Sequence, residues 1–209
     1  MKLKTPLLAL LLTAPLALLA RPESAALSMS PTPDQAQAAQ LLHGWLSDSR
    51  FAYRPRALDD ALSADIYTRY LEALDPNKQF FTAADIAQFD AVKSRLDDAI
   101  RGGDLSPAYG IFAAYRERAN ARSAYARELL KQDIFTFTGS DRFEFDREDA
   151  PWAADNAALD AVWKQSVRND WLRLKLAGKS ADEIRKTLDK RYANLADSIA
   201  ELKGEDVFQ

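Results

Sequence analysis

The stretch SADEIRKTLDKRYANLADSIAEL, residues 180–202, carries the clearest helical pattern in the sequence. It opens with a Ser-x-x-Glu capping box, in which Ser180 and Glu183 satisfy amides at the start of a helix. Gly204 is expected to end the helix. Apolar residues recur every three or four positions, which predicts one buried face made of Ile184, Leu188, Tyr192, Leu195, Ile199 and Leu202.

Five further helices are predicted upstream from the same periodicity and from residues that start or stop helices. Asp34 is expected to cap the first of them. Ser106 and Pro107 are expected to start the fourth, since proline is tolerated at the first helical position. The first helix carries apolar residues spaced three and four positions apart, namely Ala38, Leu41, Leu42, Trp45 and Leu46. The five expected ranges are 34–46, 58–74, 82–102, 107–131 and 156–176.

The helix expected at 107–131 should be roughly 37 Å long at 1.5 Å per residue and should cross the whole domain. Its predicted buried stripe is Ile111, Phe112, Tyr115, Ala119, Ala126 and Leu130. The helix at 156–176 should bury Leu159, Val162, Trp163, Val167 and Leu174. Seven glycines in 209 residues agree with long helices rather than with a chain of hairpins.

One segment has a different pattern. Residues 134–138 and 143–146 alternate apolar and polar side chains around Gly139-Ser140-Asp141, which predicts a β-hairpin. Its phenylalanines are expected to lie on helices or on a neighbouring domain, because an isolated hairpin is marginal in water. The predicted fold class is therefore mainly α, a multi-helix domain with one short β-hairpin.

The first residues are typical of a secretory signal. Lys2 and Lys4 precede an apolar run at 7–19, which is short for a bilayer span. We predict a signal peptide at 1–20, with cleavage as late as residue 26 as an alternative, and a linker at 21–33. A retained N-terminal anchor is the competing interpretation. The helical domain then covers 34–209.

Composition limits the compartment and the partners. The chain has no cysteine, so a disulfide framework is excluded, and export without disulfides is compatible with a bacterial periplasm. The formal net charge is −3, which does not build the positive field that nucleic-acid binding uses. Nucleic acid is therefore not an expected partner.

Catalytic motifs are not evident. The single histidine, His43, is expected to be structural, and carboxylate neighbours such as Asp59-Asp60, Asp97-Asp98 and Asp146 with Glu148-Asp149 do not face each other on a helix. No transition-metal set, EF-hand spacing or phosphate loop occurs. We therefore predict no catalytic, cofactor-binding or metal-binding residue in this chain.

Two groups of side chains leave alternatives open. Arg116, Arg118, Arg122 and Arg127 decorate the helix at 107–131, where they either hold an acidic partner or form a solvated face with Glu117 and Glu128. Among the tryptophans, Trp163 is expected in the core, whereas Trp171 lies off the apolar stripe and is a candidate contact with another domain.

The end of the sequence is apolar. Val207 and Phe208 stand where a terminal tail normally frays into water, so the fold is expected to have continued beyond them. We also expect the face around Phe208 and the hairpin to be apolar and to promote self-association.

Four ordered stretches together resemble the N-terminal domain of the tail-specific (carboxy-terminal processing) serine proteases. They are LEALD at 71–75 with FFT at 80–82 and Asp85; FTG at 137–139 with DR at 146–147 and APW at 150–152; LKLAGK at 174–179 with EI at 183–184, Leu188 and RY at 191–192; and EDVF at 205–208.

The resemblance implies a periplasmic scaffold of a Ser/Lys protease that degrades or processes proteins from their C-terminal tails. Its implied partners are the PDZ domain, the catalytic core and the C-terminal helical domain, together with protein substrates and a helical-repeat lipoprotein adaptor. No position here matches the catalytic serine and lysine of the family. The alternatives are a free-standing periplasmic helical binding or adaptor module without proteolytic activity, and an anchored structural protein.

Overall fold

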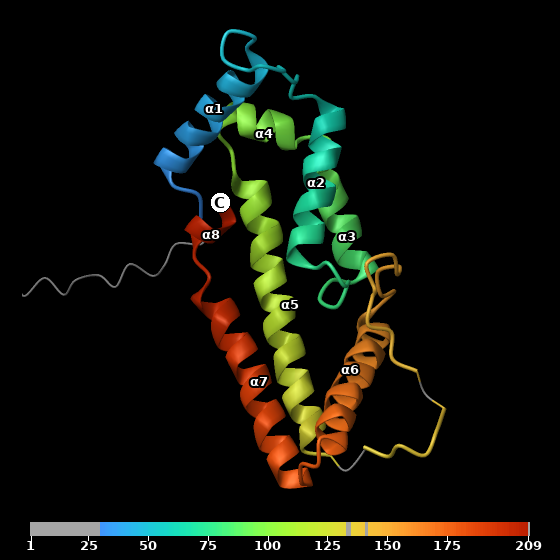
Figure 1. Ribbon diagram of the computed structural model, residues 1–209. Coiled ribbons are helices and arrows are strands. Elements are labelled where there is room, and N and C mark those ends of the chain that lie inside the picture. The colour runs from blue at the N-terminus through green and yellow to red at the C-terminus, as the bar shows by residue number, and fades with distance from the viewer. Residues whose placement is uncertain (1–29, 133–134, 141, 209) are drawn as a thin grey trace, which may run out of the picture.

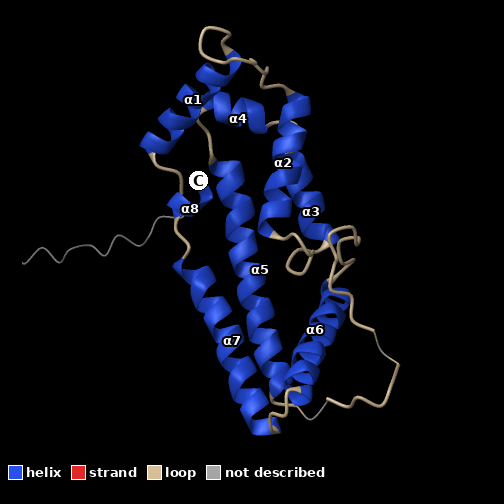
Figure 2. Ribbon diagram, viewed as in Figure 1, coloured by secondary structure: helices blue, strands red, loops and turns tan. Residues whose placement is uncertain are grey.

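The computed structural model describes residues 30–132, 135–140 and 142–208. Within these ranges the chain is helical, and the mainly α class is confirmed (Figures 1 and 2). The predicted signal peptide and most of the predicted linker lie outside the described residues. No helix in the described ranges is both long and apolar enough to cross a bilayer. The elements in chain order are α1 (Pro33–Ser47), α2 (Asp60–Leu74), α3 (Ala83–Phe89), the 3-10 turn η1 (Asp90–Val92), α4 (Leu96–Gly102), α5 (Ser106–Leu130), α6 (Asn156–Leu176), α7 (Ala181–Glu201) and α8 (Gly204–Phe208).

Helix α5 is the central element, as its predicted length implied. It has 25 residues and runs along the middle of the molecule (Figure 1). It packs against α6, α7 and α8. Its start differs slightly from the prediction: Ser106 is already helical, and the Asp104 carboxylate accepts hydrogen bonds from the Ser106 amide at 3.0 Å and hydroxyl at 2.6 Å.

The larger core cluster fills the space between the C-terminal half of α5, α6 and α7. Trp163 is at its centre with 4% exposure, and its Nε1 donates a 2.6 Å hydrogen bond to the carbonyl of Gln79. The predicted position of Trp163 in the core is confirmed. The buried members are Ala126, Leu129, Leu130, Ala153, Leu159, Trp163, Val167, Trp171, Ile184, Leu188 and Tyr192.

A second core cluster joins α2, α4 and the N-terminal half of α5 to the segment at 79–82. The fully buried Phe81 meets the rings of Phe89, Tyr115 and Trp152 at centroid distances of 5.3–6.2 Å. Edge-on aromatic contacts of this kind add to the stabilisation from burial alone. The next residue back, Phe80, lies between Tyr115 and Trp163 and so links this cluster to the larger one.

The segment at 79–82 is held by a buried carboxylate. Asp75 is 1% exposed and accepts hydrogen bonds from the amides of Gln79, Phe80 and Phe81 at 2.7, 2.9 and 3.0 Å. Burial raises the pKa of the Asp75 carboxyl, although these three amides act in the opposite direction. The turn that the sequence predicts after Leu74 is therefore built around its own aspartate.

The single helix predicted at 82–102 is wrong, because the chain breaks between η1 and α4. The hydroxyl of Ser63, on α2, donates to the carbonyl of Lys93 at 2.8 Å and accepts from the amide of Leu96 at 2.8 Å. Ser63 thus satisfies two backbone groups that a continuous helix would pair internally. The break lets α4 turn away from α3 and pack against α1 and α2.

We expect Ser63→Ala to lower the free energy of unfolding by about 1–3 kcal/mol, since it leaves the amide of Leu96 without its partner in a buried position. Urea denaturation followed by circular dichroism measures the change. Ser47→Ala is the control, because the Ser47 hydroxyl also bonds a backbone carbonyl, that of His43, but is exposed. An equal effect of the two substitutions would contradict this role of Ser63.

The predicted hairpin is not observed in the described residues at 135–140 and 142–146, which form no strand. Their aromatic side chains lie on α6 instead: Phe135 stacks on Trp171 with ring centroids 4.3 Å apart. The carbonyl of Thr136 accepts a 2.8 Å hydrogen bond from Arg168. The backbone is thus bonded to an α6 side chain, and the alternation of apolar residues reflects contacts with a helix.

Both ends of the helical domain also differ from the prediction. Helix α1 begins at Pro33 with Thr32 as its cap, and Asp34 lies within its first turn. Gly204 does not end α7, which stops at Glu201; it begins α8. Helix α8 returns to the start of the fold, where Tyr109 on α5 donates a 2.7 Å hydrogen bond to the carbonyl of Gly204.

Candidate docking surface

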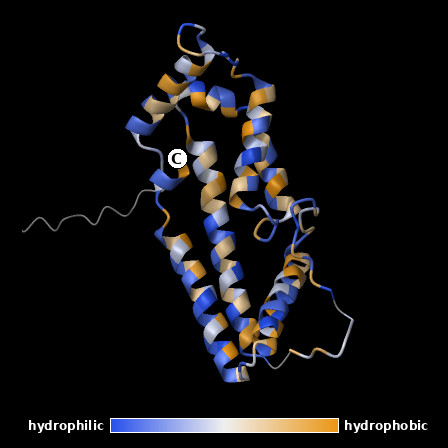
Figure 3. Ribbon diagram, viewed as in Figure 1, coloured by the Kyte–Doolittle hydropathy of each residue, from blue (hydrophilic) through white to orange (hydrophobic). Residues whose placement is uncertain are grey.

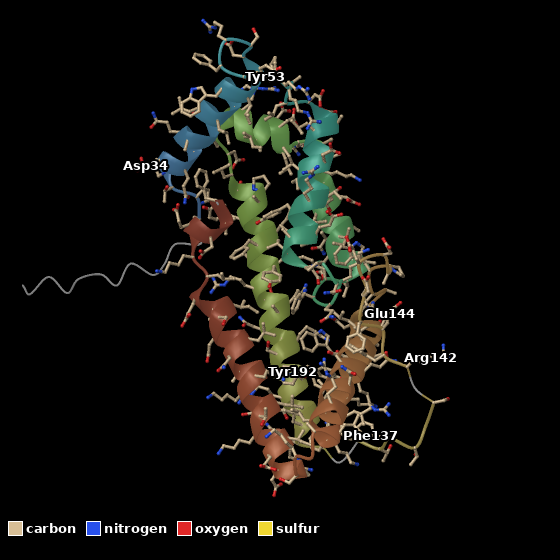
Figure 4. All side chains as sticks on the ribbon, viewed as in Figure 1. Asp34, Tyr53, Phe137, Arg142, Glu144 and Tyr192 are labelled. Atoms are coloured by element: carbon tan, nitrogen blue, oxygen red, sulfur yellow. The ribbon has the colours of Figure 1, made fainter. Side chains whose placement is uncertain are left out.

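The largest group of exposed apolar side chains lies on α1 and the loop that follows it. Four of them belong to the stripe that the helical pattern placed on one face, and each is about half exposed. Tyr53 is 96% exposed and stands at the end of the molecule (Figure 4). We call this group the α1 surface: Leu41, Leu42, Trp45, Leu46, Phe51 and Tyr53.

The α1 stripe does not face the core because α1 is attached by its first half. Gln35 and Ala39 are the buried residues of the helix. The Gln35 side chain accepts a 2.8 Å hydrogen bond from the hydroxyl of Tyr109 and donates a 3.0 Å hydrogen bond to Glu205 of α8. The polar start of α1 is therefore packed against the fold, whereas its apolar end is exposed. Figure 3 shows hydrophobic residues at this end.

A cavity of about 340 Å³ lies beside the α1 surface, between α1, α2 and α4. Six of its nine lining residues are aliphatic, namely Leu42, Leu46, Leu58, Leu62, Ile66 and Ile100. The other three lining residues are His43, Arg54 and Arg56. An exposed apolar patch next to an apolar cavity is typical of a surface that another macromolecule covers.

His43 is one of the residues that line this cavity. The nearest hydroxyl that bonds to the residue is that of Ser47, which donates to the backbone carbonyl of His43 and not to its ring. Other serine hydroxyls with hydrogen bonds in the described residues contact backbone groups or carboxylates, as Ser63, Ser106 and Ser180 do. No group of three or more potential metal ligands occurs in the described part of the chain.

The carboxylate pairs have structural roles. Asp59 caps α2 by accepting the amide of Leu62 at 2.9 Å. Asp97 and Asp98 both contact Arg101, at 3.7 and 2.9 Å. Asp146 accepts the amide of Glu148 at 3.2 Å within a loop.

The arginines of α5 connect this helix to its neighbours. Arg118 pairs with Asp85 at the start of α3 at 2.8 Å and with Glu117 at 3.0 Å. Arg122 pairs with Asp160 of α6, and Arg127 pairs with Asp189 of α7 at 2.7 Å. Arg116 donates to the carbonyl of Ala200 near the end of α7 at 3.2 Å. Three of the four arginines therefore pair with acidic side chains. Most of these acidic residues, Asp85, Asp160 and Asp189, belong to neighbouring helices of the fold.

The Asp85–Arg118 pair is the most buried of these contacts on its acidic side. Asp85 is 4% exposed and also accepts hydrogen bonds from the amide and hydroxyl of Thr82 at 2.9 and 2.8 Å. Burial acts to raise the pKa of the Asp85 carboxyl, but the hydrogen bonds from Arg118 and Thr82 outweigh it and hold the pKa below its usual range. This carboxylate fixes the start of α3 to the middle of α5.

The prediction that Trp171 meets another domain is wrong, because Phe135 covers its ring within this chain. Trp171 is 6% exposed. Trp152 packs against Phe81 at the edge of the second core cluster. Trp45 is thus the exposed tryptophan, at 57%.

The structure defines a helical domain with an exposed apolar surface on α1 and the loop after it. The family described as "Tail specific protease N-terminal domain" matches residues 48–209. A protein of Haemophilus influenzae named "Tail-specific protease" is 34% identical over 158 residues, which is 75% of this chain. The chain belongs to the family of tail-specific protease N-terminal domains. It spans 23% of the length of the Haemophilus relative, and α1 precedes the residues that match the family.

Proposed function

We propose that this chain is the N-terminal scaffold and docking portion of a periplasmic tail-specific serine protease that acts on proteins from their C-terminal tails. Family membership supports this role. The chain corresponds to a quarter of its relative's length, so we assign the PDZ and Ser/Lys regions to the remaining three quarters. Export through residues 1–20 fits the same assignment.

The α1 surface is the proposed site at which the remaining protease domains dock. Its six large apolar side chains are between 48% and 96% exposed. Helix α8 lies beside the start of α1 through the Gln35–Glu205 contact, so a domain that follows α8 in a longer protein would begin near the first half of this helix. Burying two or three such side chains is worth roughly 1.5–3 kcal/mol each, which is enough to hold adjacent domains together.

The proposed function is tested by supplying the other domains separately. Residues of the Haemophilus influenzae relative beyond its N-terminal domain are purified as one polypeptide and mixed with this chain. We expect association on a sizing column, and at least about tenfold weaker association for Leu41→Ser with Trp45→Ser, because a single buried large side chain already contributes more than that factor. Leu176→Ser is the control, since Leu176 is 79% exposed and lies on α6.

A reporter protein with an unstructured C-terminal tail then tests the enzymatic part of the proposal. We expect no cleavage by this chain alone. Cleavage by the purified chain, retained after removal of trace proteases, would overturn the scaffold role. Equal association of the α1 and Leu176 variants would reject the α1 surface as the docking site.

A further inference from the structure

The cavity of about 340 Å³ between α1, α2 and α4 lies where three helices meet at one end of the molecule (Figure 1). Helix α4 packs against both α1 and α2. Two of the lining residues, Leu62 and Ile66, lie about one turn apart on α2, and Ile66 also packs against the second core cluster. The aliphatic lining therefore adjoins the core of the fold.

The loop between α1 and α2 supplies the cationic part of the lining and is held at two points. The amide of Arg56 donates a 3.1 Å hydrogen bond to the carbonyl of Leu46 on α1. The guanidinium of Arg101, on α4, donates a 2.9 Å hydrogen bond to the carbonyl of Leu58. Arg54 and Arg56 thus line the cavity from a segment that is bonded to two of the surrounding helices.

Arg54 is the unpaired charge of this lining. Within residues 30–132, 135–140 and 142–208, no hydrogen bond or ion pair engages its guanidinium. Arg56 lies 4.0 Å from Asp65, and both side chains are more than 60% exposed, so water screens that pair. No acidic residue of the described chain lines the cavity. A carboxylate bound beside Arg54 therefore gains a partner without displacing one from within the protein.

The aliphatic lining favours a hydrocarbon chain over a polypeptide segment. A peptide brings amides and carbonyls that need hydrogen-bond partners once they leave water. The six aliphatic side chains of the lining offer none, and backbone groups inside a helix are bonded within that helix. A hydrocarbon chain has no such groups to satisfy, so it is the ligand that the lining fits.

The volume of the cavity sets the length of that chain. An apolar cavity of about 150 Å³ holds benzene, which has six carbon atoms. On the same scale, about 340 Å³ holds roughly twelve carbon atoms. We propose that the cavity binds a medium-chain fatty acid, with its hydrocarbon chain among the six aliphatic residues and its carboxylate paired with Arg54. The proposal goes beyond the docking of protease domains, and its test needs this chain alone.

The test is isothermal titration calorimetry of the full chain with sodium dodecanoate near neutral pH. We expect one saturable site per chain, with a dissociation constant below about 0.1 mM. Octanoate should bind at least about tenfold more weakly, because its chain is shorter by four methylenes and each buried methylene contributes about fourfold to affinity.

The role of Arg54 is tested through the charge of the ligand. Dodecyltrimethylammonium should bind at least about fivefold more weakly than dodecanoate, since it brings a positive head group to Arg54. Arg54→Glu should reverse this preference. The matched control is Arg173→Glu, on the exposed side of α6 and outside the lining, which should change either affinity less than about twofold.

The position of the hydrocarbon chain is tested by filling the cavity. Leu62→Trp places a larger side chain in the lining and should weaken dodecanoate binding at least about tenfold. Leu41→Trp is the matched control, because Leu41 belongs to the α1 surface but not to the lining, and its effect should stay below about threefold. Circular dichroism at 222 nm checks that the variants are folded.

Three results would each overturn the proposal: no saturable binding of dodecanoate, equal binding of dodecyltrimethylammonium, or equal effects of Arg54→Glu and Arg173→Glu. Equal affinities of the Leu62→Trp and Leu41→Trp variants would place the hydrocarbon chain outside the cavity and so also reject it. An N-acetylated Ala-Leu-Leu peptide with a free carboxylate that binds more tightly than dodecanoate would assign the cavity to a polypeptide end instead.

Discussion

Trp163→Ala is expected to lower the free energy of unfolding by about 3–5 kcal/mol. The side chain is almost fully buried and lies between Phe80 and Tyr192, at centroid distances of 5.9 and 6.3 Å. Alanine leaves a cavity at the junction of the two core clusters. It also removes the donor that satisfies the carbonyl of Gln79. Since domains of this size are stable by only about 5–15 kcal/mol, the variant should be close to unfolding at room temperature.

The control is Trp45→Ala, which makes the same substitution on the α1 surface. Trp45 is 57% exposed, so we expect a change within about 0.5 kcal/mol. Urea titration at 25 °C, with unfolding followed by circular dichroism at 222 nm, measures both variants. A loss of stability in Trp45→Ala comparable with that in Trp163→Ala would show that the α1 surface is part of the folded core.

Asp85→Asn is expected to lower the free energy of unfolding by about 2–3 kcal/mol at pH 7, because it replaces a buried carboxylate that accepts charge-assisted hydrogen bonds. The amide retains the shape of the side chain but has only one acceptor oxygen. It cannot serve the Thr82 amide, the Thr82 hydroxyl and the Arg118 guanidinium together. The start of α3 is therefore expected to loosen from α5.

The loss of stability caused by Asp85→Asn should become smaller as the pH falls. The folded-state pKa of Asp85 lies below its ordinary value of 3.8, so the stabilisation is fully present above that value and is lost as the pH falls through the lower folded-state pKa. The difference in the free energy of unfolding between the native protein and Asp85→Asn should stay constant from pH 7 to about 5 and become smaller below about pH 4. A difference that is undiminished at pH 3 would contradict this assignment.

Asp189→Asn is the control for the pH series. Asp189 also pairs with an α5 arginine, and the hydrogen bond from Arg127 lowers the pKa of its carboxyl. Both partners are close to half exposed, so water screens the pair and we expect a cost below about 1 kcal/mol. Comparison of the two variants separates the effect of burial from that of ion pairing.

Local signals in the sequence predicted the parts of the fold that depend on local interactions. The capping box of Ser180 and Glu183 forms as expected, with the Ser180 amide donating to Glu183 at 2.9 Å. The helix predicted at 156–176 has the observed bounds. In both cases neighbouring residues supply the start signal and the periodicity.

The errors arise where a residue distant in the sequence determines the local structure. The break before α4 depends on Ser63, about 30 residues away, and a local pattern contains no sign of it. The alternating phenylalanines at 135–145 fit a strand equally well, and only the exposed side of α6 makes them a cover for a helix. Periodicity also shows that α1 has an apolar stripe but not whether the fold supplies a surface to cover it.

The candidate surfaces could be predicted only in part from the sequence. The apolar residues of α1 were identified and lie on a helix as predicted, but their exposure was not predicted. The expected apolar face around Phe208 is a smaller feature, since Phe208 is 36% exposed and the α1 surface holds most of the exposed apolar side chains.

The contact between α1 and α8 brings the first and last described helices together, across 170 positions of sequence. During synthesis α1 emerges early. Its Gln35 side chain can bond to Glu205, and the Tyr109 hydroxyl to the Gly204 carbonyl, only after these later residues have been made. The other helices can assemble around α5 before that moment. The contacts of α1 with α8 therefore form only after Glu205 has been synthesised, whereas its contacts with α4 can form earlier.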